Sequence, residues 1–170
     1  RGRNETIAGL DIGKHRHPSH LAVFERWKNA EGDYVYKQLL SAWLDGMNYN
    51  NQWDYLLNVA ALYNLDVLRY DNTRGEFEAF MENATPEQKR IFKPVVFNLK
   101  SKNAMAAGID ALVTSSRITL LNDRRQTEQI LAVTSDLNAF ESDEGHGDSF
   151  WSVGLAVKPE KEKVFRVRTV

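Results

Sequence analysis

The chain contains no cysteine, and this absence excludes several kinds of chemistry. Without thiols there is no disulfide framework, no zinc–thiolate site and no cysteine nucleophile. Long hydrophobic runs are also lacking, since none approaches the ~20 residues of a membrane span, and no secretory signal peptide is visible. Charge of one sign is not in excess, because 22 basic and 23 acidic residues leave a formal net charge of -1. This balance excludes a protein that coats DNA through overall basicity, but it allows local basic patches.

A length of 170 residues suits one domain with its own core. The hydrophobic share of 42% and the charged share of 26% are ordinary for a globular protein. The sequence begins at Arg1 rather than at Met. We therefore expect a single domain over residues 1–170 that is part of a longer protein.

The first part of the sequence predicts an antiparallel meander. Apolar and β-favouring residues indicate strands over residues 5–12, 21–27 and 34–44, with a polar loop at 14–20 and a turn at 29–33. Three strands joined by such connections pair in antiparallel order.

From residue 51 onward the pattern alternates between helices and strands. Helical spacing predicts helices over 51–63, 76–81, 102–115, 123–132 and 150–157, with a loop or helical turn near residue 86. Shorter apolar runs predict strands at 65–70, 95–99, 118–121 and 137–140, and an edge strand at 164–168. The combination indicates an α/β fold, in which a mixed sheet of meander and parallel strands carries helices on both faces.

Three aspartates lie where predicted elements end or begin. Asp11 and Asp71 close apolar runs predicted as strands, and Asp148 opens the last predicted helix. Ligands in open α/β sheets gather at the carboxyl ends of strands, so we expect the three carboxylates to converge. Carboxylates brought together oppose each other's ionisation unless cations lie between them, and Mg²⁺ is the usual cation where phosphate is the substrate.

The trio therefore predicts a two-metal site for phosphoryl transfer, with Asp11 as the bridging ligand. Gly13 follows Asp11 closely, and its missing side chain would let a phosphate or a metal approach the backbone. His146 is placed to orient the attacking water or to contact the scissile phosphate, and Asp143 and Glu144 are candidate auxiliary ligands.

Several basic residues lie in loops predicted to follow strand ends, where they would contact DNA phosphates. They are Lys14, Arg16, Arg74, Lys100 and Lys102. A histidine-rich stretch is interpreted as a solvated loop rather than as a metal site. It consists of His15, His17 and His20.

Three motifs carry a family resemblance: Gly9-Leu10-Asp11-Ile12-Gly13 with the following 18–23, Tyr70-Asp71-Asn72-Thr73-Arg74-Gly75, and the segment 145–156. At these motifs the sequence resembles the nuclease domain of the large terminase subunit of tailed bacteriophages, a member of the ribonuclease H-like superfamily. The third motif, an acid that opens a helix ending in an apolar Leu-Ala pair, is the most specific. In one respect the sequence departs from some relatives, which have Glu where Asp71 stands.

The resemblance implies an endonuclease that depends on Mg²⁺ or Mn²⁺ and cuts concatemeric viral DNA during genome packaging. It implies Asp11, Asp71 and Asp148 as catalytic metal ligands and His146 as a further catalytic residue. The implied partners are double-stranded DNA, a preceding ATPase domain, the small terminase subunit and the portal, with no membrane, in the cytoplasm of the host cell. The sequence has no Gly-x-x-x-x-Gly-Lys-Ser/Thr loop, so the ATPase domain is not part of it.

Three alternatives remain open at this point. Other ribonuclease H-like enzymes, such as junction resolvases and transposase cores, use similar carboxylates. The run Leu10-Asp11-Ile12-Gly13 also opens actin-like and sugar-kinase domains, where it faces ATP phosphates, but that architecture needs a second domain. Finally, a non-catalytic domain could keep the fold to bind DNA or the portal.

Overall fold

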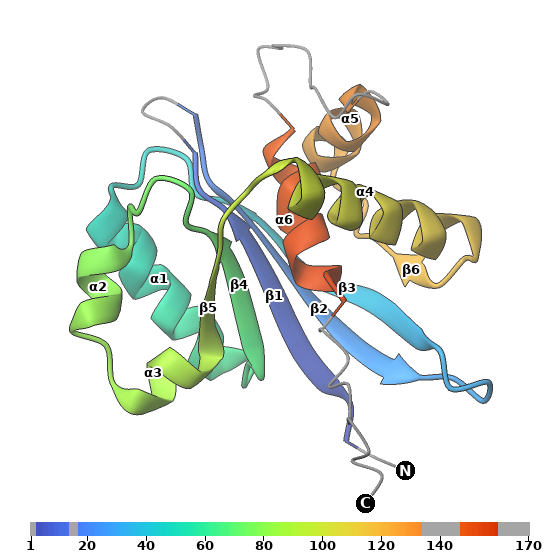
Figure 1. Cartoon of the computed structure of the whole chain (residues 1–170), viewed down its shortest axis with the longest axis horizontal. Helices are drawn as coiled ribbons and strands as arrows, with labels where there is room; N and C mark the ends of the chain where they lie inside the picture. The colour runs from blue at the N-terminus through green and yellow to red at the C-terminus, as the bar shows by residue number, and fades with distance from the viewer. Residues whose placement is uncertain (1–2, 14–16, 134–146, 160–170) are drawn as a thin grey trace, which may run out of the picture.

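A six-stranded mixed sheet forms the centre of the computed structural model (Figure 1), which describes residues 3–13, 17–133 and 147–159. The strands lie in the order β5-β4-β1-β2-β3-β6. Their bounds are β1 (Glu5–Asp11), β2 (His20–Lys28), β3 (Tyr34–Trp43), β4 (Val67–Asp71), β5 (Phe92–Val95) and β6 (Ile118–Thr119). The first three strands pair antiparallel, whereas β4, β5 and β6 join as parallel strands. The predicted mixed α/β sheet is confirmed.

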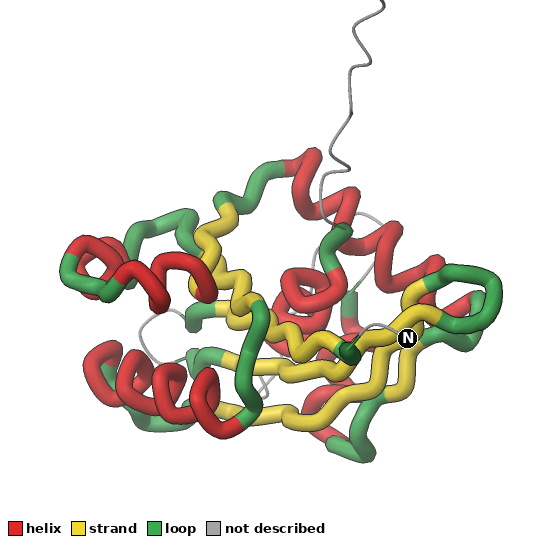
Figure 2. Tube along the Cα trace, turned by 90° about the horizontal axis from the view of Figure 1, so that it is seen from below, coloured by secondary structure: helices red, strands yellow, loops and turns green. Residues whose placement is uncertain are grey.

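Helices cover both faces of this sheet (Figures 1 and 2). One layer contains α1 (Tyr49–Leu62), α2 (Glu78–Glu82) and α3 (Pro86–Ile91). The other contains α4 (Leu99–Thr114), α5 (Arg124–Ala132) and α6 (Asp148–Val157). Successive strand side chains point to opposite faces, so Ala8 and Leu10 of β1 enter the first layer's core while Ile7 enters the second.

An aromatic cluster fills the first core. The ring of Trp53 on α1 lies 5.7 Å from Phe77, 5.4 Å from Phe80 and 4.9 Å from Phe92, measured between ring centres. These distances are typical of favourable aromatic pairs. The cluster packs α1 and α2 against β5.

The second core is built around α6, of which every residue is buried. Gly9 of β1 makes this possible, because a Cβ atom there would lie 1.9 Å from the carbonyl oxygen of Ser152 and 2.4 Å from the amide nitrogen of Ala156. At the other end of the helix, the Arg69 guanidinium donates to the carbonyls of Ala156 at 3.0 Å and Leu155 at 3.4 Å. Both contacts hold α6 directly against β1 and β4.

The predicted strand at 95–99 is wrong. The strand ends at Val95, and Leu99 already belongs to α4. Asn98 caps this helix by accepting from the Ser101 amide, and the Ser101 hydroxyl in turn accepts from the Asn98 amide. This reciprocal cap stabilises the start of a helix at Leu99, although the β-branched residues just before it favour a strand.

The helix predicted over 123–132 is present as α5, which Asp123 caps by accepting from the Gln126 amide at 3.1 Å. The Gln126 side chain bonds to Gln38. The segment at residue 86 forms the helix α3 rather than a loop. The predicted strands at 137–140 and 164–168 lie outside the described residues. Among the described helices, none has the length and apolar character needed to cross a membrane.

Candidate active site

Asp11 and Asp71 end adjacent parallel strands. The register pairs Leu10 with Tyr70, so the two aspartates occupy the next position along β1 and β4. Gly9, against which α6 packs, lies two residues before Asp11, and alternation therefore places the Asp11 side chain on the face that α6 covers. Asp71 likewise lies two residues after Arg69, the β4 residue that binds α6, so the Asp71 side chain is on the same face. Both carboxylates therefore lie at the end of the sheet beneath α6.

Asp148 reaches this point from the first turn of α6. The preceding Gly147 has φ of 82°, a left-handed conformation that glycine adopts without strain, and it provides no side-chain cap. An acidic side chain in the first turn also complements the partial positive charge of the helix N-terminus. Asp11, Asp71 and Asp148 are all buried, with exposed fractions of 7%, 9% and 7%.

The electrostatics of Asp11 show that the three carboxylates act on one another. Burial raises the pKa of Asp11 well above its ordinary value, and the charges of Asp148 and Asp71 raise it further. The nearby cations of Arg74 and Lys102 lower it, but not enough to compensate. Asp148 and Asp71 therefore lie near enough to Asp11 for their charges to act on it.

The donor set suits a hard divalent cation, because it consists of carboxylate oxygens whose repulsion a cation would relieve. Within the described ranges, however, no three His, Asp or Glu side chains are arranged closely enough to hold a metal ion. The Asp71 Oδ1 atom is engaged within the chain, since it accepts from the Thr73 amide at 2.8 Å and from the Thr73 hydroxyl at 2.5 Å. The trio fits the cation in charge and chemistry, and its side chains would have to rotate to bind one.

Among the predicted phosphate-binding residues, Arg74 and Lys102 lie near the trio. The Arg74 guanidinium donates to the Ile12 carbonyl at 2.9 Å and forms an ion pair with Glu76. The Lys102 ammonium lies 5.0 Å from the centre of the Trp151 ring. A third residue of this set is exposed on α4, namely Lys100. The other predicted site residues lie outside the described ranges: Lys14, Arg16, Asp143, Glu144 and His146.

Gly13 does not have the role predicted for it. A Cβ atom at this position would lie 2.1 Å from the carbonyl oxygen of His17 and 2.6 Å from that of Pro18. The space beside Gly13 is therefore filled by the chain's own backbone rather than left open for a phosphate or a metal.

His20 is a site residue that the sequence did not reveal. It was assigned to a solvated loop, but it is the first residue of β2, fully buried, and pairs across the sheet with Asp11. Its ring nitrogens lie 2.5 Å from the Ser152 hydroxyl and 2.9 Å from the Ser41 hydroxyl. The available signal was Ser152 itself, because a small polar residue in the apolar run 150–157 indicates a buried polar partner.

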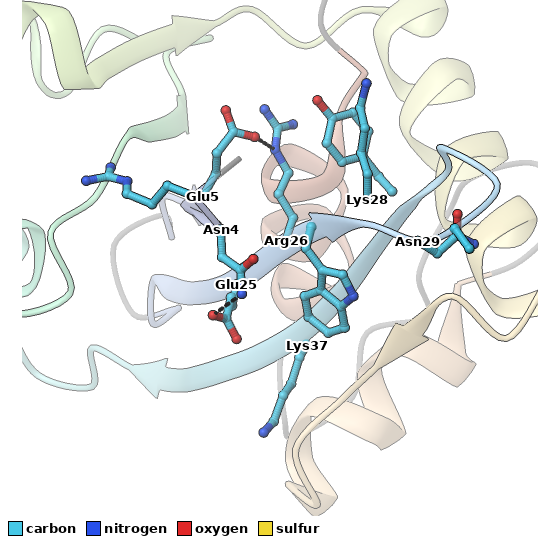
Figure 3. A pocket seen from close by; sticks show the side chains of 11 residues that line it. Asn4, Glu5, Glu25, Arg26, Lys28, Asn29 and Lys37 are labelled. Atoms are coloured by element: carbon cyan, nitrogen blue, oxygen red, sulfur yellow. Dashed lines mark hydrogen bonds and ion pairs between the residues drawn. The ribbon is translucent and has the colours of Figure 1, made fainter. Parts of the chain in front are cut away.

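A cavity of about 990 Å³ lies at the other end of the strands (Figure 3). Two acids of its lining are engaged by neighbours: Arg26 donates to Glu5 at 2.6 Å, and Asn4 donates to Glu25 at 2.8 Å. Glu5 begins the strand that Asp11 ends, so the cavity is separated from the carboxylates by the length of β1. We therefore place the candidate active site at the buried trio and not in this cavity.

No protein-family model matches the chain, and no curated protein sequence matches it. Solved structures do match. The large terminase nuclease from thermophilic phage G20c is 18% identical, with a TM-score of 0.64 over 92% of this chain and 82% of that one. The large terminase nuclease domain from bacteriophage SPP1, solved with bound Mn, is 12% identical, with a TM-score of 0.56 over 89% of this chain and 84% of that one.

A protein from a bacterium also matches. RuvC from Thermus thermophilus is 12% identical, with a TM-score of 0.55 over 90% of this chain and 91% of that one. At these identities the likeness concerns the fold. The chain therefore has the ribonuclease H-like fold, in the form found in phage large terminase nuclease domains and in RuvC.

Proposed function

We propose that the chain is a divalent-metal-dependent endonuclease that hydrolyses phosphodiester bonds in double-stranded DNA. The observation that carries this proposal is the pKa of Asp11, which burial, Asp148 and Asp71 all raise. A fold gains nothing in stability from three mutually repelling, buried acids, so a function that uses them is the better explanation. Phosphoryl transfer with Mg²⁺ or Mn²⁺ is the chemistry that such a donor set serves.

In this proposal Asp11, Asp71 and Asp148 hold the cations, with Asp11 between its two neighbours. Two bound cations would activate the attacking water and stabilise the leaving oxygen. The charges of Lys102 and Arg74 partly balance the negative charge around Asp11, and in this proposal the two residues would also contact the phosphates of the DNA backbone. The low exposure of the trio strengthens each of these charge interactions, since little water screens them.

The biological setting that we propose is viral genome packaging, in which the chain cuts concatemeric DNA. The supports are the sequence motifs around the three acids and the likeness to two phage large terminase nucleases. One of those nucleases was solved with bound Mn and the G20c nuclease also with bound zinc, which agrees with a nuclease that binds a divalent cation. An ATPase domain, a small terminase subunit and the portal are the partners that this setting requires.

Cleavage of supercoiled plasmid with Mn²⁺, Mg²⁺ or a chelator tests the proposal. We expect cutting with either cation, none with the chelator, and none by Asp11→Asn or Asp148→Asn. Asp54→Asn is the matched control, because Asp54 is an exposed aspartate on α1, on the opposite face of the sheet. Full cleavage by either site variant, or cleavage in the chelator, would contradict the metal site.

A junction-resolving nuclease is the second candidate. It is kept because the match to RuvC covers 91% of that chain, so a protein other than a terminase fits this fold over nearly its whole length. Parallel assays on linear duplex and on a four-way DNA junction separate the two functions. Preference for the duplex supports the packaging nuclease, and cutting confined to the junction would replace it.

A further inference from the structure

A series of polar contacts runs from α6 to the start of α5 along the face of the sheet that both helices cover, and His20 is at its centre. The Ser152 hydroxyl of α6 lies 2.5 Å from His20 Nδ1, and the Ser41 hydroxyl of β3 lies 2.9 Å from His20 Nε2. Ser41 then donates to the Asp123 carboxylate at 2.7 Å, which also accepts from Trp43 at 3.0 Å. His20 and Ser152 are both completely buried.

The proton positions along this series of hydrogen bonds follow from Asp123, the acceptor at its end. Asp123 is a carboxylate that only accepts, and the bond from Ser41 to it is charge-assisted. The Ser41 oxygen therefore accepts from the Nε2–H of His20, and the unprotonated Nδ1 of a neutral His20 faces the Ser152 hydroxyl, which also donates to the Ser149 carbonyl at 3.0 Å. Burial lowers the pKa of His20 to about 3, so this neutral form is the one present near pH 7.

His20 links the two elements that carry acids of the trio. It lies directly across from Asp11 in the β1–β2 register. Ser152, its partner on α6, is one helical turn after Asp148, and residues four apart lie on the same side of a helix. The bond between His20 and Ser152 therefore ties the first turn of α6 to the strand beside β1, whereas the bonds of Ser149 to Gln126 and Gln129 tie it to α5.

We propose that His20 is a positioning residue for the active site, which fixes Asp148 relative to Asp11 through its bond to Ser152. The inference rests on the proposed function and adds a residue to it. His20 itself contacts neither substrate nor cation. Removing it should let the N-terminal turn of α6 shift while the rest of the helix stays held by Gly9 and Arg69.

Three substitutions separate positioning from general stability. His20→Ala removes both bonds. His20→Asn places an amide near the position of Nδ1 and can keep the bond to Ser152, whereas His20→Gln reaches the position of Nε2 and can keep only the bond to Ser41. Val59→Ala is the control, because it opens a space in the first core, on the far side of the sheet, and lowers stability without touching the network.

Calorimetric titration with Mn²⁺ gives a readout that does not depend on cleavage. We expect His20→Ala to weaken Mn²⁺ binding by about 10–100-fold, the usual effect of losing a group that orients metal ligands. Plasmid cleavage should lose kcat to a similar extent with little change in the KM for DNA. His20→Asn should restore most of both quantities and His20→Gln much less. At an equal fall in Tm, Val59→Ala should leave both unchanged.

The inference is overturned if His20→Ala binds Mn²⁺ as Val59→Ala does, or if His20→Gln restores binding as well as His20→Asn. If His20→Ala does not fold, the comparison of the Asn and Gln variants still decides. A wild-type chain that binds Mn²⁺ and cuts DNA, with a silent His20→Ala, contradicts only the role of His20. A wild-type chain that neither binds nor cuts overturns the proposed function as well.

Discussion

Asp148 raises the pKa of Asp11 more strongly than Asp71 does, although Asp71 occupies the adjacent strand. The acid supplied by the helix is thus the stronger neighbour of Asp11 in the absence of a cation. Asp71 itself accepts from the amide and hydroxyl of Thr73 in the loop that follows β4. The order of the two effects is measurable.

The first prediction concerns this order. Asp148→Asn should lower the pKa of Asp11 more than Asp71→Asn does, because it removes the larger of the two repulsions. Carboxyl carbon shifts followed by NMR during a pH titration without divalent cations would measure both changes. An equal shift in the two variants would contradict the order.

The second prediction is that Asp11→Asn stabilises the metal-free protein while abolishing cleavage. A raised pKa in the folded state means that Asp11 favours folding below its unfolded pKa and loses that contribution as the pH rises through the folded value. At neutral pH the ionised side chain therefore costs stability, and a neutral amide does not. We expect a higher Tm, at roughly 2–4 °C for each 1 kcal/mol gained.

The same experiment has an internal check. Adding Mn²⁺ should raise the Tm of the wild type, since a ligand bound only to the folded state stabilises it. The rise should be much smaller for Asp11→Asn. An unchanged or lower Tm of the metal-free variant would contradict the charge repulsion.

The third prediction concerns Gly9. Gly9→Ala should destabilise the fold by about 1–3 kcal/mol, because the new Cβ atom must push α6 away from β1. Gly108→Ala is a matched control, since its Cβ atom meets nothing closer than 4.0 Å and an alanine inside α4 should stabilise slightly. Chemical denaturation of both variants measures the difference. A Gly9→Ala variant as stable as Gly108→Ala would show that α6 is not in direct contact with the strand.

The fourth prediction concerns acid pH. The folded-state pKa of His20 is lowered to about 3 from 6.5, so the unfolded state binds a proton first as the pH falls. The contribution of His20 to stability is therefore complete above about pH 6.5 and is lost between pH 6.5 and 3, at roughly 1.4 kcal/mol per pH unit. Denaturation of the wild type and His20→Asn over this range should show a shallower pH dependence in the variant. Parallel curves would contradict a buried neutral histidine.

Much of the fold could be predicted from the sequence because its strands and helices have clear periodicity. Alternation and turn residues indicated β1, β2 and β3, and the positions of Asp11 and Asp71 at strand ends followed from them. The segment at 95–99 was mistaken because a cap made by Asn98 and Ser101 outweighs the preference of a short β-branched run. Such short segments take their structure from contacts that the pattern alone does not contain.

The three acids of the candidate site could be predicted from the sequence, but the residues packed around them could not. Each aspartate ends a strand or begins a helix that has a clear hydrophobic pattern, so the end of the sheet at which it lies could be inferred. His20 could not be assigned in this way, because its partners Ser41 and Ser152 come from distant parts of the chain. Gly13 was misjudged for a different reason, since the carbonyls of His17 and Pro18 that crowd it depend on how the following loop folds back.

The docking of α6 on Gly9 has a consequence for the order of events during folding. Asp11 and Asp71 belong to strands in the first half of the sequence, whereas Asp148 joins them only when α6, the last described helix, packs on the sheet. A partly folded chain thus has two of the three acids and cannot assemble the complete set. Nuclease competence would then appear together with the completed fold, so an unfinished chain could not cut DNA prematurely.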